Sequence, residues 1–179
     1  IVINKIIFKR NKTSKEQINN IEIYTKNKAF IPNNKCYLSP ENAKLKFIYL
    51  IITRFSIEFS TYLQFKKIIY SEDYIKNGIR VLKKYLLPSL ESQSCKDFTW
   101  ILMLGDKANI TNIISLIDFK TSFDIKIIYK KDIKHYITNI SKDLDILITT
   151  RIDFDDVIYY NAVNDVRKEI DFNRSEEHT

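Results

Sequence analysis

The sequence predicts an α/β protein with a doubly wound, mostly parallel sheet and helices on both of its faces. Two observations lead to this fold class. Four short apolar segments rich in β-branched residues recur between residues 47 and 150, which is typical of strands buried on both faces. Each of them is followed by a segment whose apolar residues recur at helical spacing. Such strand–helix alternation predicts βαβ units and therefore parallel strands.

The four expected core strands are continuous apolar runs that end in polar or turn residues. The first ends in Thr53 and Arg54, and the second is followed by Gly105 and Asp106. Because parallel strands in one sheet end at the same edge, these polar residues are expected to lie along one edge of the sheet. In chain order the strands are Phe47–Thr53, Phe98–Leu104, Ile125–Tyr129 and Ile146–Thr150.

Helical periodicity fills the intervals between these strands. From Asp73 to Gln93 one apolar stripe is expected to face the core, with a kink or restart at Pro88, because proline lacks a backbone N–H. Asn109 is expected to cap a short helix through its side chain. Residues 133–140 form another amphipathic segment, and Val157–Ile170 is expected to be a last helix with Tyr159 on its buried side.

The two ends of the chain are harder to interpret. Residues 1–44 are expected to be a leader or the end of a preceding segment, although Ile1–Phe8 could form a strand. Residues 174–179 resemble the translated start of a sequencing adapter, so a non-native tail is expected there. The central unit is then residues 45–173, a truncated domain.

Composition restricts the class of protein. Hydrophobic residues make up 45% of the chain, which is enough for a real core. No apolar run approaches the roughly 20 residues of a membrane span, and two cysteines are too few for a disulfide framework, so the cytoplasm is the expected compartment. The net charge of +7 comes mainly from scattered lysines, so we expect no nucleic-acid partner.

The most informative stretch is Asp145–Asp156, with the sequence DILITTRIDFDD. It places three carboxylates, Asp153, Asp155 and Asp156, just after a buried strand, where α/β sheets bind ligands. Clustered acids repel one another unless a cation lies between them. Carboxylate oxygens suit Mg²⁺ or Mn²⁺, which bridge to phosphates. The simpler interpretation is a polar turn capping the following helix, for which one aspartate would suffice.

Four segments together resemble a known family: Leu87–Gln93 (LPSLESQ), Phe98–Trp100 (FTW), Leu104–Asp106 (LGD) and Arg151–Asp156 (RIDFDD). The chain resembles the putative rhamnosyltransferase family, a branch of the GT-A-fold glycosyltransferases related to glycosyltransferase family 2. The resemblance covers about Phe47–Ile170. It implies a GT-A-like fold and a divalent metal that holds a nucleotide-diphosphate sugar for transfer to a glycan or another hydroxyl acceptor.

The resemblance also implies roles for individual residues. Asp153 and Asp155 match the D-x-D motif that holds the metal against the donor pyrophosphate, and the third acid of the pattern falls on Asp156. Asp106 matches an acid that often binds the nucleotide base. Three further candidates for the nucleotide-sugar site are Thr53, Arg54 and Arg151. The base that activates the acceptor is expected beyond the end of this chain, so no catalytic residue is assigned and the fragment alone is expected to be inactive.

Two other functions fit parts of the sequence. Asp153-Phe-Asp-Asp-Val157 matches D-x-D-x-V of haloacid-dehalogenase-like phosphatases, with Asp153 as nucleophile and Asp155 as general acid/base. That motif normally follows the first core strand, whereas here three strand–helix units precede it. A non-catalytic basic module that binds nucleotides or nucleic acid is the other alternative.

Overall fold

A computed structural model describes residues 2–6, 46–58, 68–117 and 120–175, with side chains from Lys46 to Lys168 within these ranges. The strands are β1 (Val2–Ile6), β2 (Phe47–Phe55), β3 (Thr99–Leu104), β4 (Asp124–Tyr129) and β5 (Ile146–Asp153). The helices are α2 (Glu72–Lys84), α3 (Leu86–Glu91), α4 (Ile110–Leu116), α5 (Ile133–Ile140), the 3-10 turn η2 (Ser141–Asp143) and α6 (Ala162–Ser175).

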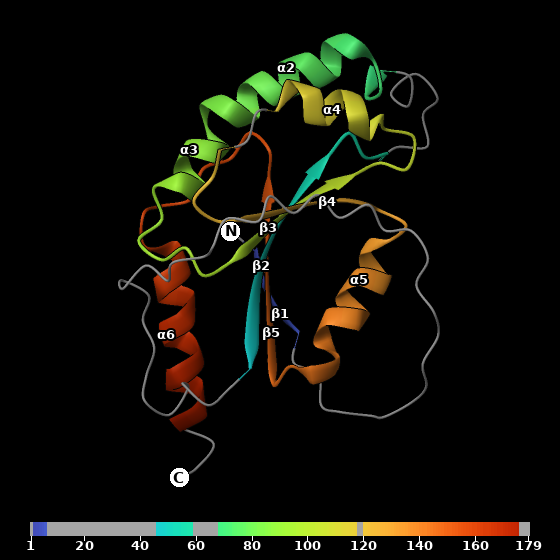
Figure 1. Ribbon diagram of the computed structural model, residues 1–179. Helices are drawn as coiled ribbons and strands as arrows, with labels where there is room; N and C mark the ends of the chain where they lie inside the picture. The colour runs from blue at the N-terminus through green and yellow to red at the C-terminus, as the bar shows by residue number, and fades with distance from the viewer. Residues whose placement is uncertain (1, 7–45, 59–67, 118–119, 176–179) are drawn as a thin grey trace.

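The strands form one sheet in the order β1-β5-β2-β3-β4 (Figure 1). Strands β2, β3, β4 and β5 are mutually parallel where they pair, and β1 lies antiparallel to β5. Counted along the chain from β2, the parallel strands follow the spatial order 3-2-1-4, the beginning of the Rossmann arrangement. The predicted α/β class and parallel sheet are therefore confirmed, and the strand suggested within residues 1–8 is β1.

Helices cover both faces of the sheet. Helix α5 packs on one face, where Tyr136 joins Leu50, Ile101 and Leu147 in a small apolar cluster. The other face carries the larger cluster, to which α2, α3, α4 and α6 all contribute side chains. Figure 1 shows α5 and α6 on opposite sides of the sheet, so the chain crosses from one face to the other through β5.

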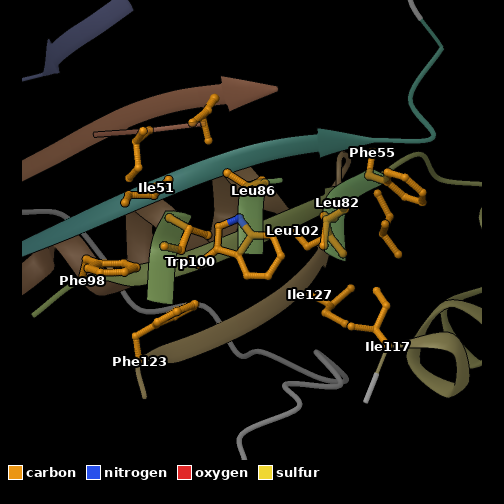
Figure 2. Packing of buried hydrophobic residues seen from close by; sticks show 14 of the residues in the cluster. Ile51, Phe55, Leu82, Leu86, Phe98, Trp100, Leu102, Ile117, Phe123 and Ile127 are labelled. Carbon is orange, nitrogen blue, oxygen red and sulfur yellow. The ribbon is translucent and has the colours of Figure 1, made fainter. Parts of the chain in front are cut away.

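The larger cluster has Trp100 at its centre (Figure 2). The side chain of Trp100 is 0% exposed, and its indole N–H donates to the hydroxyl of Thr53 at 2.9 Å. Phe123 lies beside the indole, with ring centroids 6.3 Å apart. Because a buried indole N–H needs an acceptor, Thr53 satisfies it inside the core. Trp100 is thus a core residue, as its apolar strand suggests.

The predicted helix of residues 73–93 is divided into two. Helix α2 begins after Ser71, whose hydroxyl accepts the backbone N–H of Tyr74 at 3.3 Å, and it ends before Tyr85. Helix α3 restarts at Leu86, so Pro88 lies in its first turn. A proline is tolerated in a first turn because its missing N–H would have no helical partner there. The restart therefore comes two residues before the proline.

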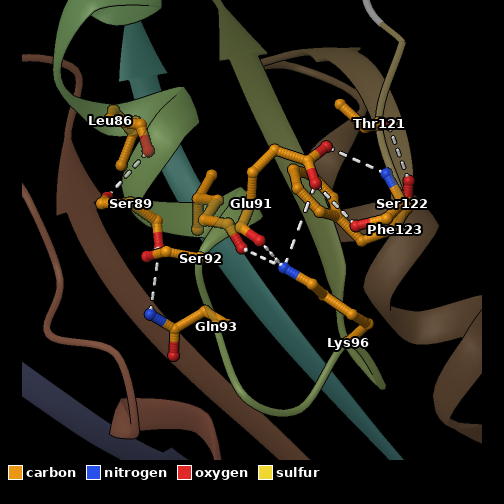
Figure 3. A network of polar contacts seen from close by, with 10 residues as sticks. Leu86, Ser89, Glu91, Ser92, Gln93, Lys96, Thr121, Ser122 and Phe123 are labelled. Carbon is orange, nitrogen blue, oxygen red and sulfur yellow. Dashed lines mark hydrogen bonds and ion pairs between the residues drawn. The ribbon is translucent and has the colours of Figure 1, made fainter. Parts of the chain in front are cut away.

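Side chains close the carboxyl end of α3 (Figure 3). The ammonium of Lys96 donates to the carbonyls of Leu90 and Glu91, and the side chain of Lys96 lies 4.0 Å from the Glu91 carboxylate. Glu91 in turn accepts the N–H and hydroxyl of Ser122 at 2.9 and 2.6 Å. A cation at a helix carboxyl end satisfies orphan carbonyls and complements the helix dipole. Burial nevertheless lowers the pKa of Lys96.

Two further helices test the sequence predictions. Asn109 caps α4 as expected, since its side chain accepts the N–H of Asn112 at 3.0 Å. The last helix, α6, begins at Ala162 rather than at Val157, and Tyr159 is 54% exposed instead of facing the core. The expectation for Tyr159 was wrong because residues 158–160 lie outside the helix and hydrogen-bond to Ser89, Gln93 and Ser94.

The predicted tail lies largely outside the described residues, although the backbone of α6 continues to Ser175. The same applies to most of the predicted leader, residues 7–45. None of the helices in the described part of the chain is both long enough and apolar enough to span a membrane.

Candidate functional site at the carboxyl edge of the sheet

The candidate site lies where the carboxyl ends of β2 and β5 meet. These strands are parallel neighbours, although two other strands, β3 and β4, lie between them along the chain. From β2 the chain proceeds to β3 and β4 on one side, and it returns to β5 on the other side. The boundary between β2 and β5 is therefore the topological switch point, where open α/β sheets form ligand crevices.

Arg54 and Asp153 face each other across this boundary. They are register partners at the ends of the two strands. Arg54 Nη2 donates to Asp153 Oδ1 at 3.0 Å, and Arg54 Nε donates to the same oxygen at 3.3 Å. The side chains are 24% and 45% exposed, respectively. The pair combines a fixed strand register with partial access to solvent, so a ligand can reach both charges.

Arg151 adds a second guanidinium on the same face. It precedes Asp153 by two residues on β5, and alternate residues of a strand point to the same side. The register opposes Arg151 to Ile52 on β2, and its side chain is exposed. Two arginines therefore flank Asp153, one across the strand boundary and one along the strand.

The three acids lie on a tight turn that follows β5. The N–H of Asp156 donates to the carbonyl of Asp153 at 3.2 Å, and a carboxylate oxygen of Asp156 accepts the N–H of Asp153 at 3.4 Å. One acid thus closes the turn, but the turn does not cap the following helix as the simpler interpretation expects, because α6 begins only at Ala162. Asp155 and Asp156 are both exposed, whereas Asp153 is only partly so.

Phe154 fixes this turn to the core. Its ring meets Phe55 edge to face, with centroids 5.4 Å apart. Phe55 itself packs against Gly78 of α2, where an added Cβ would lie only 2.6 Å from the Phe55 ring. Aromatic pairs of this geometry are favourable and specific. Helix α2 therefore supports the acidic turn through the Phe55 ring.

Helix α2 also brings a tyrosine near the acids. Burial raises the pKa of Tyr74, and the negative charge of Asp155 raises it further. Its phenol is a hydrogen-bond donor within electrostatic range of the exposed carboxylate. Tyr74 had no signal in the sequence, because only the docking of α2 places it there.

A second polar group occupies the same edge at the ends of β2 and β3. Burial raises the pKa of the Tyr70 hydroxyl, which also hydrogen-bonds to Glu58 and lies near Asp106. Glu58 forms an ion pair with Lys107 at 3.4 Å. An added Cβ at Gly105 would collide with the Ser56 carbonyl and would lie 2.6 Å from the Tyr70 hydroxyl. The glycine is needed because the two strand ends approach so closely here.

Backbone strain occurs at the same sheet edge, at Ser56. Ser56 follows the last residue of β2 with φ of 53°, in the left-handed region. Its hydroxyl donates to the carbonyl of Ile69 at 2.6 Å. Strained residues of this kind persist only where surrounding structure holds them, and they cluster at functional sites.

The predicted site residues divide into two groups. Arg54, Arg151 and the three acids lie together at the switch point, and Asp106 lies at the same edge on the far side of β2. Asp106 and Asp153 thus follow strands that end at the same edge of the sheet, and their convergence on one cleft stays a prediction. Asp106 is exposed, and its carboxylate accepts the N–H of Lys131 at 3.0 Å. Thr53 is fully buried against Trp100, so we leave it out of the proposed site.

No preformed metal centre accompanies the acids. Within the described residues, no group of three or more histidine, cysteine, aspartate or glutamate side chains could hold a metal ion. The predicted ligands Asp153, Asp155 and Asp156 therefore do not form one three-carboxylate cluster, and Asp153 is already paired with Arg54. A metal ion at this edge would need ligands from the substrate, and it stays a prediction.

A small pocket lies at the opposite edge of the sheet. It has a volume of ≈ 120 Å³ and is lined at the amino ends of three strands by Phe47, Lys96, Asp97, Phe98 and Asp124, among others. Ligand sites usually measure about 300–1,000 Å³ and lie at the carboxyl edge of parallel sheets. We therefore place the candidate site at the acids rather than in this pocket.

The haloacid-dehalogenase alternative fits this geometry poorly. The nucleophilic aspartate of such a phosphatase would be Asp153, whose carboxylate accepts two bonds from Arg54. That ion pair gives Asp153 a structural partner at the strand boundary. The motif also follows the fourth parallel strand of the chain rather than the first.

Comparison with known proteins gives one result. A family model described as "Putative rhamnosyl transferase" matches residues 45–178. No curated protein matches the chain, and neither does any solved structure. The match covers both β2 and β5 and the acidic turn, and it agrees with the resemblance carried by the LPSLESQ and RIDFDD segments. The chain belongs to the putative rhamnosyl transferase family.

Proposed function

We propose that this chain binds a nucleotide-diphosphate sugar at the boundary between β2 and β5 and presents it for transfer to an acceptor hydroxyl. Glycosyl transfer is the chemistry in the description of its family. One observation supports this placement of the donor. Arg54 and Asp153 meet at the topological switch point, directly before the exposed carboxylates of Asp155 and Asp156.

The two arginines supply the positive charge for the diphosphate. Guanidinium groups bind phosphate oxygens through two parallel N–H bonds. Arg151 is exposed on the face that carries Arg54 and Asp153. Arg54 is anchored through Asp153, and it remains 24% exposed. We assign Arg151 as the direct phosphate contact, and Arg54 as the group that orients the Asp153 carboxylate.

The acids fit a hard divalent cation in their chemistry. All three are oxygen donors, and Mg²⁺ usually takes only one or two carboxylates and leaves other positions to water and substrate phosphates. Asp153 is engaged by Arg54, and Asp156 closes the turn. Asp155 is therefore the proposed main ligand of Mg²⁺ or Mn²⁺, with Asp153 and Asp156 assisting. When bound, such an ion neutralises charge that develops on the departing diphosphate.

Asp106 is the proposed contact for the nucleoside. It is exposed at the end of β3, and the N–H of Lys131 orients its carboxylate. Tyr70 and Glu58 lie next to it at the same edge. The end of β2 separates this polar group from the acidic turn. The diphosphate is therefore proposed to bind between them. We assign no catalytic base to the described residues.

Calorimetry can test this proposal. ADP, GDP, UDP and dTDP are titrated into the protein with Mn²⁺ and with EDTA, and the tightest ligand is then used with Asp155→Asn. We expect binding to depend on Mn²⁺ and the mutation to lower affinity by about tenfold only when metal is present. Lys134→Asn, at an exposed position on α5, is the charge-changing control. Equal affinities with and without metal would contradict the proposal.

A further inference from the structure

The LPSLESQ segment makes an unusual set of contacts with the chain that follows the acids. Ser89, Gln93 and the following residue Ser94 hydrogen-bond to five positions between Ile158 and Val163, almost 70 residues away. The bonds in order are Ile158 N–H to Ser89 Oγ (3.3 Å), Gln93 Nε2 to Tyr159 O (2.8 Å), Ser94 N–H to Tyr160 O (2.9 Å), Ser94 Oγ to Asn161 Oδ1 (2.7 Å) and Val163 N–H to Gln93 Oε1 (3.2 Å).

Gln93 is the centre of this arrangement. Its side chain is 2% exposed, and both ends of its amide are used. The Nε2 group donates to the carbonyls of Ser89 and Tyr159 at 3.0 and 2.8 Å, while the Oε1 atom accepts the N–H of Val163. Figure 3 shows Ser89 and Gln93 together at the end of α3. A buried amide with all these partners fixes the position of each of them.

The same amide explains where α6 begins. Val163 is the second residue of α6, and N–H groups in a first helical turn have no partner within the helix. Helices usually satisfy them with a local cap. Here Gln93 of the α3 end supplies the acceptor from another part of the chain. The start of α6 is thus tied to α3.

Only a short connection joins this contact to the acids. Only Val157 separates the acidic turn from Ile158, the first residue that is held. On its other side the turn is fixed by β5 and by the Phe154–Phe55 contact. A loop fixed at both ends has few conformations, so its carboxylates lose little entropy when they bind a ligand.

We propose that Gln93, supported by Ser89 and Ser94, is a positioning residue for the acidic turn. It acts through the backbone of residues 158–163, without contacting the ligand. Its effect on ligand binding rests on the proposed function, namely metal-dependent binding at Asp155. Its effect on the turn itself does not, and the two can be measured separately.

The experiment compares Gln93→Met with Asp97→Asn in the full chain. Methionine keeps the volume of glutamine but removes the bonds to Tyr159 and Val163. Asp97 pairs with Arg167 at 2.6 Å, so the control weakens another link between the β3 entrance and α6, farther from the acids. Hydrogen exchange of the Asp155–Val157 amides reports on the turn, and calorimetry with Mn²⁺ and the tightest nucleoside diphosphate reports on binding.

We expect Gln93→Met to speed exchange at Asp155–Val157 and to lower the metal-dependent part of the affinity by about tenfold, as outer-shell substitutions do. Asp97→Asn should leave both within about twofold of wild type. If Gln93→Met does not fold, Ser89→Ala, which removes the bond to Ile158, takes its place, with a smaller effect expected in the same direction.

Unchanged exchange of the turn amides in the folded variant would overturn the inference. A wild-type protein without metal-dependent binding would overturn the proposed function instead, and hydrogen exchange alone would then decide the role of Gln93. If Asp97→Asn had the same effect on the turn as Gln93→Met, general loosening of α6 would be the cause and the specific role of Gln93 would be refuted.

Discussion

Replacement of Gly78 by alanine tests how α2 supports the acidic turn. Gly78 lies in the interior of α2 and is buried. An added Cβ would lie 2.6 Å from one atom of the Phe55 ring and 3.0 Å from another. Phe55 is only 1% exposed and is held edge-on by Phe154. The ring therefore cannot move away into solvent, and any shift is transmitted to the acidic turn.

The expected change in stability is the difference between two opposing effects. Alanine in place of glycine inside a helix stabilises by about 1 kcal/mol. Overpacking a dense core costs about 1–3 kcal/mol, and the closeness of the contact favours the middle of that range. We therefore expect Gly78→Ala to lower the free energy of unfolding by about 1 kcal/mol.

Urea unfolding followed by circular dichroism measures this change. Asn77→Ala is the matched control, because the Asn77 side chain is exposed. This substitution should change only helix propensity, which raises the free energy of unfolding by about 0.5 kcal/mol. Phe55→Leu should relieve the clash, giving a coupling of about 1 kcal/mol in the double-mutant cycle. A Gly78→Ala protein that is more stable by the full propensity gain would refute this packing argument.

Three further substitutions have definite expected outcomes. Gly105→Ala should destabilise by about 3 kcal/mol or prevent folding, because its Cβ would collide with the Ser56 carbonyl; wild-type stability in urea would contradict the close approach of β2 and β3. Lys96→Met should lower the free energy of unfolding by about 1 kcal/mol, since two carbonyls at the end of α3 lose their donor; increased stability would mean that burial of the charge outweighs these bonds. The hydrogen bond to Asp165 raises the pKa of Tyr159 to about 12. The stability that this hydrogen bond contributes is therefore present below about pH 10 and is lost as the pH rises toward about 12. In Asp165→Asn, ultraviolet titration should show one tyrosine pKa returning toward about 10, and an unchanged titration curve would contradict the assignment.

Much of the fold could be predicted because it depends on local pattern. The β2 and β3 segments are apolar along most of their length, as is typical of strands in a sheet covered on both faces. The parallel strands in turn place Arg54, Asp106 and Asp153 at one edge, so the position of these candidate residues in the sheet could also be predicted.

The details that were not predicted depend on contacts between distant segments. The pairing of Arg54 with Asp153 requires the register of two strands separated by 99 residues. The late start of α6 requires Gln93, and the presence of Tyr74 beside Asp155 requires the docking of α2. Periodicity within a segment contains no information about these contacts.

The burial of Thr53 shows a different limit. Its position at the end of an apolar strand suggested a ligand contact, but alternate residues of a strand face opposite sides. Thr53 faces the larger core and Arg54 the other side. Adjacent polar residues at a strand end therefore cannot both be assigned to one site without knowing which face is covered.

The central claim is that the nucleotide diphosphate and its metal bind at the carboxyl edge between β2 and β5. Paramagnetic broadening by Mn²⁺ in amide NMR spectra, recorded with the tightest nucleoside diphosphate and with Mg²⁺ as the diamagnetic control, tests this location directly. We expect the amide signals of Arg54, Asp155 and Val157 to broaden, while those of Asp97 and Asp124 at the opposite edge remain sharp. Broadening centred on Asp97 and Asp124, or no localised broadening at all, would contradict the account.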